Sequence, residues 1–239
     1  MYYLWDPTFL LLIPPMLLAL YASTKVKSTF SKYAQQRASS GVTGAEVARG
    51  ILRDSGLTNV AVKRTSGTLS DHYDPRAGEL CLSEEVHDSP SLAALGVAAH
   101  EAGHALQDAS GYVPLKLRQG IWPVAAFGSN LGPILAMIGI IILALAGKDA
   151  TWAMAMAKVG IITFAVATGF TVMTIPVELN ASRRALTVLE SSGYIGPRER
   201  PHVKKVLDAA ALTYMAAAFM AIMMLLRFIL LLAMVARRD

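Results

Sequence analysis

Ser91-Leu-Ala-Ala-Leu-Gly-Val-Ala-Ala-His100-Glu-Ala-Gly-His104-Ala-Leu-Gln-Asp-Ala109 is the segment from which the rest of this sequence can be interpreted. It is rich in Ala and Leu and contains no Pro, so a helix is predicted, with Ser89-Pro90 as its start signal. Positions i and i+4 of a helix lie on one face, one turn apart. The imidazoles of His100 and His104 can therefore converge on one metal ion, with Glu101 projecting toward the same place.

The spacing H-E-x-x-H also specifies a chemistry. A Zn²⁺ ion held by such a pair makes a bound water acidic enough to ionise near neutral pH, and the Glu between the histidines takes the proton. The pattern predicts a zinc metallopeptidase of the gluzincin type, with one Zn²⁺ per chain, His100 and His104 as ligands and Glu101 as general base. The competing interpretation is a buried helix with two incidental histidines. It is disfavoured because chance placement of the His and Glu residues of this chain would give H-E-x-x-H in only about three of a thousand such chains.

The composition indicates a membrane protein. Of the 239 residues, 54% are hydrophobic and only 16% are charged, and the mean hydropathy is +0.45. The hydrophobic share is higher, and the charged share lower, than is usual in soluble domains. Basic residues flank apolar spans and form no stripe with interleaved aromatic residues, so a nucleic-acid partner is not expected. The single cysteine, Cys81, excludes an intramolecular disulfide.

Four apolar segments approach the length of about 20 residues that crosses a bilayer: 8–22, 122–146, 152–175 and 209–235. Pro14-Pro15 interrupts the first, so a kinked or tilted span is expected. This span lacks the basic start of a cleaved signal peptide and is predicted to be a retained anchor with its N-terminus outside. The second and third spans are joined by the short loop 147–150 and form a hairpin.

Basic residues predict the orientation of these spans. The two longer polar segments, between the first and second spans and between the third and fourth, carry 17 Lys and Arg residues. The other side has three, namely Lys148, Arg237 and Arg238. Because basic residues are retained on the cytoplasmic side, both segments are expected to face the cytoplasm, and the chain to reside in the cell membrane.

The polar region before the second span is expected to be an α+β region. Thr43 and Glu46 form a predicted capping box for a helix that ends near Gly56. Alternating residues predict strands at 59–64 and 78–83, with a polar turn at 69–76 between them. The predicted fold is an α-helical membrane protein with about four transmembrane helices and a small zincin-like cytoplasmic region. Its expected parts are an anchor (1–24), the catalytic region (25–120), a transmembrane hairpin (121–176), a cytoplasmic segment with the third zinc ligand (177–207) and a C-terminal span (208–239).

A catalytic zinc needs a third protein ligand, and Glu178 is the predicted one. It follows the third span on the same side as His100, and Pro176 suits a helix start that would put Glu178 and Ser182 on one face. Ser182 could then orient a metal ligand through a hydrogen bond on the side away from the metal. The alternative role for Glu178 is to stabilise a helix N-terminus. Three other acids near the strands are expected to be solvated: Glu79, Glu84 and Glu85.

His72 and Tyr73 are candidate catalytic residues, because a donor beside the zinc would stabilise the oxyanion of a tetrahedral intermediate. The alternative is that Asp71-His72 and Asp74-Pro75 simply make the turn. His87 and His202 are interpreted as surface residues, and Lys158 and Arg227, inside apolar spans, as cations that extend to the interface.

Six segments together resemble the YugP-type family of membrane zinc metallopeptidases, which is distantly similar to the HtpX-type proteases. The matching segments are 42–49, 71–76, 80–84, 96–107, 114–118 and 176–186. The resemblance implies His100, His104 and Glu178 as zinc ligands and Glu101 as catalytic base. It departs at Asn180, where the family more often has Asp.

The expected partners are the lipid bilayer and a peptide or protein substrate, which includes membrane proteins. We expect the substrate to extend along an edge strand at 80–83 by backbone pairing. An intramembrane protease is disfavoured because only about nine apolar residues precede His100 and no Asp lies within the spans. A non-catalytic membrane scaffold or partner subunit that retains the zinc site is the alternative from a different class. The sequence gives no oligomeric state.

Overall fold

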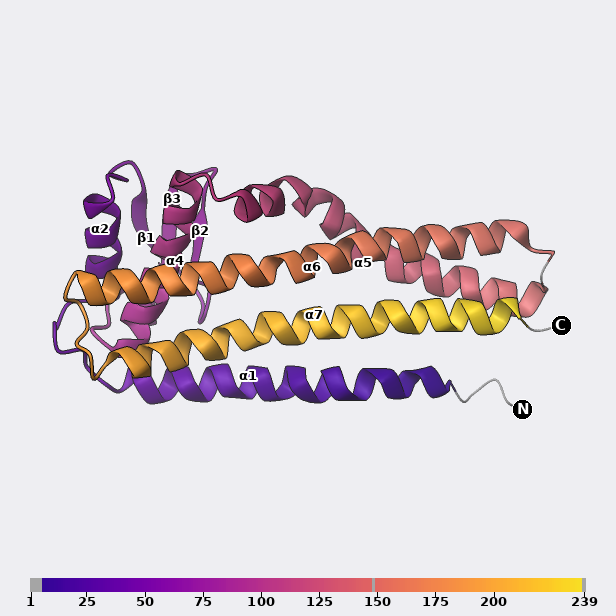
Figure 1. The fold of residues 1–239 in the computed structure, drawn as a ribbon, viewed down its shortest axis with the longest axis horizontal. Coiled ribbons are helices and arrows are strands. Elements are labelled where there is room, and N and C mark those ends of the chain that lie inside the picture. The colour runs from indigo at the N-terminus through magenta and orange to yellow at the C-terminus, as the bar shows by residue number, and fades with distance from the viewer. Residues whose placement is uncertain (1–5, 148, 238–239) are drawn as a thin grey trace. The chain divides into compact units, whose positions relative to one another are not determined.

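The computed structural model describes residues 6–147 and 149–237 and is mostly helical (Figure 1). Residues 1–5 of the predicted anchor, and Lys148 and Arg238 of the charge count, lie outside the described residues. The elements are η2 (Pro7–Leu12), α1 (Ile13–Ala34), α2 (Gly44–Asp54), β1 (Ala61–Thr65), β2 (His72–Asp74), β3 (Glu79–Ser83), α3 (Glu84–His87), α4 (Leu92–Ala109), α5 (Val113–Ala146), α6 (Thr151–Ser191) and α7 (Arg200–Ala236).

The chain forms two compact units. The first, here called the helical unit, comprises the described parts of 1–21, 117–174 and 214–239. The second, the α+β unit, comprises 22–116 and 175–213 and therefore joins the two segments that were both predicted to face the cytoplasm. α1, α5, α6 and α7 each contribute residues to both units.

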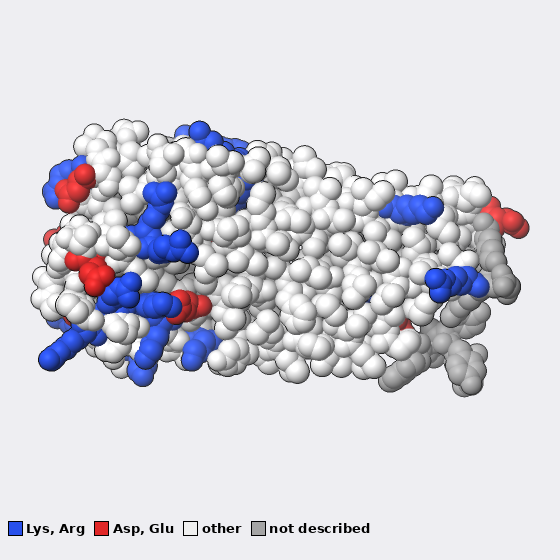
Figure 2. Space-filling model, viewed as in Figure 1, with Lys and Arg blue, Asp and Glu red and all other residues white. Residues whose placement is uncertain are grey.

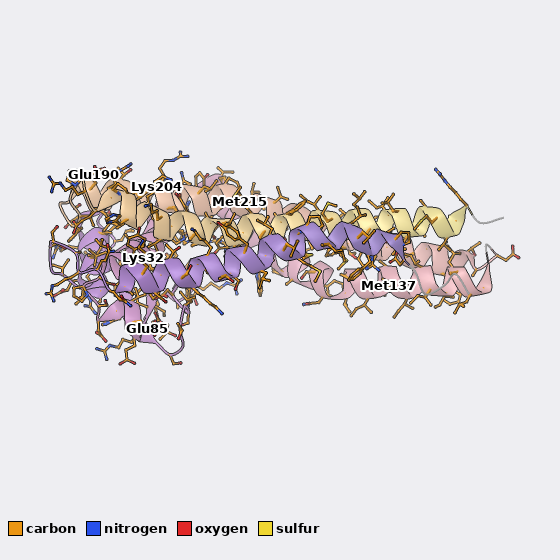
Figure 3. The ribbon with its side chains drawn as sticks, turned by 90° about the horizontal axis from the view of Figure 1, so that it is seen from below. Lys32, Glu85, Met137, Glu190, Lys204 and Met215 are labelled. Carbon is orange, nitrogen blue, oxygen red and sulfur yellow. The ribbon has the colours of Figure 1, made fainter. Side chains whose placement is uncertain are left out.

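Within the described residues, four helical stretches are long and apolar enough to cross a membrane, as predicted. They are Pro7–Ala34, Val113–Ala146, Thr151–Ser191 and Arg200–Ala236, each longer than the apolar run within it. Figure 2 shows the visible surface of the helical unit as largely uncharged, whereas Lys and Arg gather on the α+β unit. Lys32, Glu190 and Lys204 are among the exposed charged residues of the latter (Figure 3).

Small residues let α5 and α6 approach closely in the helical unit. A Cβ on Gly160 of α6 would collide with the backbone nitrogen of Ala136 of α5. Such close contact is how helices associate where lipid removes the hydrophobic driving force. Phe164 and Phe228 add an edge-to-face pair with ring centroids 5.9 Å apart, which packs α7 against α6.

The helix predicted to start at Pro176 does not start there, because α6 runs unbroken from Thr151 to Ser191 with Pro176 inside it. Proline removes only its own N–H from the helical hydrogen bonds, and helix-compatible residues continue on both sides. Glu178 and Ser182 still lie on one face, one turn apart.

The α+β unit is built on the predicted capping box, in which Thr43 and Glu46 satisfy each other's backbone N–H groups at the start of α2. Its core is shared by α1, α2, α3, the sheet, α4 and the parts of α6 and α7 that belong to this unit. The largest fully buried aliphatic side chains in this core are Val47, Ile51, Leu80, Leu82, Val86, Leu95, Leu189 and Val203.

Two sequence expectations about the sheet are wrong. The segment predicted as a turn contains β2, and the strand predicted as an edge, β3, is central, since the order is β1-β3-β2. β3 pairs in parallel with β1 and antiparallel with β2. Asp71 causes this arrangement, because its carboxylate accepts the Ser83 backbone N–H at 2.8 Å and brings residues 72–74 beside β3. Asp74 then accepts the Arg76 N–H, which moves the turn to the residues after β2.

Candidate metal centre

Helix α4 carries the histidine pair. It begins at Leu92, with Ser91 as N-cap accepting the Ala94 N–H at 3.2 Å, two residues after the predicted start signal. Its residues are almost all small or aliphatic, so it can be buried on most of its circumference. A buried helix holds its side chains in fixed rotamers, which a metal site requires.

Gly103 allows α6 to approach α4 at the histidine pair. A Cβ built on Gly103 would lie 2.8 Å from the carbonyl oxygen of Ala181, closer than real Cβ contacts allow. The backbone of α6 therefore passes directly over the turn of α4 between His100 and His104. This contact lies wholly within the α+β unit.

Three donor atoms converge at this crossing. The Nε2 atoms of His100 and His104 lie 3.2 and 3.5 Å from the same oxygen, Oε2 of Glu178. Each of the three residues offers one ligand atom, and all three atoms lie within 4.8 Å of one another. Two ligands at 2.0–2.2 Å from a tetrahedral ion are about 3.3–3.6 Å apart, so the measured separations fit a Zn²⁺ between them.

The Nδ1 atoms of both histidines are hydrogen-bonded on the side away from Glu178. Nδ1 of His100 is 3.1 Å from the Ser182 hydroxyl, the residue predicted to orient a ligand. Nδ1 of His104 is 3.0 Å from Oε1 of Gln107, which is fully buried. A metal-binding histidine almost always has its second nitrogen hydrogen-bonded, so both rings are arranged as ligands.

Gln107 is part of the site, although no ligand motif in the sequence indicates it. Its position three residues after His104 put it on the same face of α4, which was the available signal. Its Nε2 donates to Oδ1 of Asn180 at 2.9 Å, and Arg184 donates Nε to the same oxygen at 2.9 Å. Asn180 thus supports the site as a neutral acceptor.

Burial and charge make the site attractive to a cation. Glu178 is 2% exposed, and Glu101 and His104 are each 9% exposed. Burial alone would lower the pKa of His104, but its hydrogen bond to Glu178 and the nearby charges of Glu101 and Glu178 raise the pKa above its ordinary value. Two imidazoles and a carboxylate are a donor set that Zn²⁺ prefers, so the residues present fit zinc.

The predicted oxyanion donors make their hydrogen bonds elsewhere. His72 is exposed on β2, with Nδ1 2.8 Å from the Ser70 carbonyl oxygen. The Tyr73 hydroxyl donates to Asp108 at 3.1 Å, and burial together with the Asp108 charge raises the pKa of Tyr73 to about 12. Because Asp108 follows His104 by one turn of α4, Tyr73 ties β2 to the helix that carries the histidines.

The other candidates lie outside the three-residue group. Glu84 and Glu85 are exposed, Glu85 at the surface of α3 (Figure 3), and Glu79 pairs with Lys63 at 2.5 Å. His87 contacts Asp88 at 2.7 Å, and His202 stacks on Tyr33 with centroids 5.2 Å apart. Arg227, predicted to extend to the interface, pairs with Asp6 at 2.6 Å within the helical unit.

Comparisons with known proteins identify the family. Residues 8–233 match the family described as "Putative neutral zinc metallopeptidase". The chain is 45% identical to the protein named "Putative membrane protease YugP" of Bacillus subtilis (strain 168) over 213 residues, which cover 89% of this chain and 91% of that protein. No solved structure matches the chain. The resemblance seen in the sequence is thereby confirmed, and the chain belongs to the neutral zinc metallopeptidase family.

Proposed function

We propose that the protein is a membrane-embedded zinc endopeptidase of the gluzincin type, with His100, His104 and Glu178 as ligands of one Zn²⁺. The observation that carries the proposal is the convergence of both Nε2 atoms on Oε2 of Glu178, at 3.2 and 3.5 Å. A cation bound at this point would be within reach of all three atoms at once. Three protein ligands leave a fourth position for water, as in catalytic zinc sites.

Glu101 is proposed as the proton carrier of the reaction. Zinc bound at the site would act as a Lewis acid and lower the pKa of a water to about 7. The Glu101 carboxylate, next to His100 on α4, would accept the proton of the attacking water and later deliver it to the departing amine nitrogen. Its burial keeps bulk water from competing for that proton.

We propose that a substrate peptide pairs with the outer edge of β2, and not with the central strand β3. β2 ends the three-stranded sheet, so its outer backbone groups are available for pairing with an extended peptide. The hydrogen bond from Tyr73 to Asp108 fixes β2 relative to α4, so the peptide would be held near the helix that carries His104.

The proposed topology follows the charge distribution. The helical unit would lie in the cell membrane, and the α+β unit, with the catalytic region 25–120 and the ligand-bearing segment 177–207, would face the cytoplasm. The compact association of 22–116 with 175–213 supports this, because both polar segments must then lie on one side.

The decisive experiment combines metal analysis with proteolysis. The full chain, purified in detergent, is expected to bind one zinc per chain and to cleave casein or a detergent-solubilised membrane protein. Glu101→Gln is expected to retain the zinc and to lose cleavage, because the amide cannot accept the proton. Retained turnover in this variant would remove Glu101 as the base. Zinc binding without any cleavage by the wild-type chain would favour the non-catalytic scaffold.

A further inference from the structure

We infer that Gln107 is a positioning residue that fixes the tautomer of His104 and locks it to the turn of α6 that carries Glu178. The inference rests on the proposed function, since it concerns the same zinc site. It is drawn from the hydrogen bonds of one side chain that is fully buried between α4 and α6.

The orientation of the Gln107 amide is determined by its neighbours. One end of the amide lies 2.8 Å from the backbone carbonyl oxygen of Val177 and 2.9 Å from Oδ1 of Asn180. A backbone carbonyl can only accept a hydrogen bond, so this end must be the NH₂ group. The oxygen Oε1 therefore faces His104.

The tautomer of His104 follows from that orientation. Oε1 lies 3.0 Å from Nδ1 of the imidazole and can only accept, so Nδ1 must carry the proton. In the neutral ring, Nε2 then has its lone pair free, and Nε2 is the atom directed at Glu178. A carbonyl oxygen on α6 thus decides which nitrogen of a histidine on α4 can bind a metal.

His100 is not constrained in the same way. Its Nδ1 lies 3.1 Å from the Ser182 hydroxyl, which can donate or accept, so this contact is compatible with either tautomer. Gln107 also contacts the neighbour of the third ligand, because Val177 immediately precedes Glu178 in the chain. One amide group therefore holds both the second and the third ligand, with Asn180 and Arg184 fixing its far side.

Two substitutions separate the positioning role from a merely structural one. Gln107→Glu keeps an acceptor at His104 but loses both donors to α6. Gln107→Met, similar in volume, loses the acceptor and the donors together. If the acceptor matters as well as the contact with α6, zinc affinity falls more in the Met variant than in the Glu variant; if only the contact with α6 matters, both variants lose affinity equally.

The experiment measures zinc affinity in the full-length protein in detergent, by competition with a chelator, for wild type, both variants and Thr187→Ala, an exposed site on α6. We expect Gln107→Met to bind zinc about 10- to 100-fold more weakly than wild type, Gln107→Glu to lose less affinity than Gln107→Met, and Thr187→Ala to stay within about threefold of wild type. ¹⁵N spectra of the zinc-free protein are expected to show a hydrogen-bonded proton on Nδ1 of His104 in wild type and the loss of that hydrogen bond in Gln107→Met.

The outcomes are distinct. An unchanged zinc affinity and Nδ1 hydrogen bond in Gln107→Met, or equal losses in Met and Glu variants, would overturn the inference while leaving the proposed function standing. If Gln107→Met does not fold, the ¹⁵N spectrum of Gln107→Glu decides, because a tautomer other than Nδ1–H in that variant overturns the inference. A wild-type chain that binds no zinc would overturn both, and a zinc-binding chain that cleaves nothing would overturn only the proposed function.

Discussion

Replacing Gly103 by Ala tests whether the close crossing of α4 and α6 creates the metal site. The new Cβ would lie 2.8 Å from the Ala181 carbonyl oxygen, 3.3 Å from its carbonyl carbon and 3.4 Å from its Cα. These are backbone atoms of a buried helix, so no side-chain rotation relieves the overlap. Since ordinary contact begins at 3.4 Å, the two helices must separate by about 0.6 Å, the difference between 3.4 and 2.8 Å.

The expected effect on zinc binding exceeds the effect on folding. Overpacking costs about 1–3 kcal/mol, while replacing a helical Gly by Ala returns about 1 kcal/mol. The net loss of folding free energy is therefore about 0–2 kcal/mol. Metal–ligand distances, however, tolerate only about 0.2 Å, so a 0.6 Å separation between the histidines and Glu178 is expected to weaken zinc binding at least about tenfold.

Zinc competition and thermal unfolding in detergent measure the two quantities separately. Gly169→Ala is the matched control, since it adds the same methyl group to α6 at a position where nothing lies within 4 Å. The control is expected to leave zinc affinity unchanged. Wild-type zinc affinity in Gly103→Ala would refute the claim that this contact sets the distance between the ligands.

Three further variants test other contacts. Glu178→Ala is expected to lose the zinc, and one zinc per chain in that variant would reject Glu178 as a ligand. Burial alone would raise the pKa of Glu199, but the N–H groups of Gly196 and Ser39 and the Ser39 hydroxyl hold the pKa of Glu199 below its ordinary value. The Glu199 carboxylate therefore stabilises the fold fully above about pH 4.3, and this stabilisation is lost as the pH falls through the lowered pKa. Glu199→Gln is expected to lower the unfolding temperature by more at pH 7 than at pH 4. An equal decrease at both pH values would contradict this. Asp6→Asn leaves the Arg227 guanidinium without its ion pair and is expected to cost about 2 kcal/mol, less than for a fully buried pair because Asp6 stays partly exposed. Adding Arg227→Met is expected to restore thermal stability, and no recovery would mean that the unpaired Arg227 charge is not the cause of the loss.

Local patterns predicted the elements but not their order in the sheet. Alternation located β1 and β3 within two residues, and the spacing of Thr43 and Glu46 identified the start of α2. β2 was missed because its three residues resemble a polar turn; it pairs with β3, next to the hydrogen bond between Asp71 and Ser83. The interior position of β3 was missed for the same reason, since it depends on β2.

The sequence by itself determined the four apolar spans and the placement of His100, Glu101 and His104, because both follow from the period of a helix and from side-chain hydrophobicity. It also offered Glu178 as a third ligand from its place in the chain. Only the tertiary structure decided that Glu178 meets the histidines, that Gly103 permits this approach, and that Gln107 aligns His104. The ligands His100 and Glu178 lie 78 positions apart on α4 and α6, and Gln107 contacts Val177 70 positions away, so no local periodicity records such pairing.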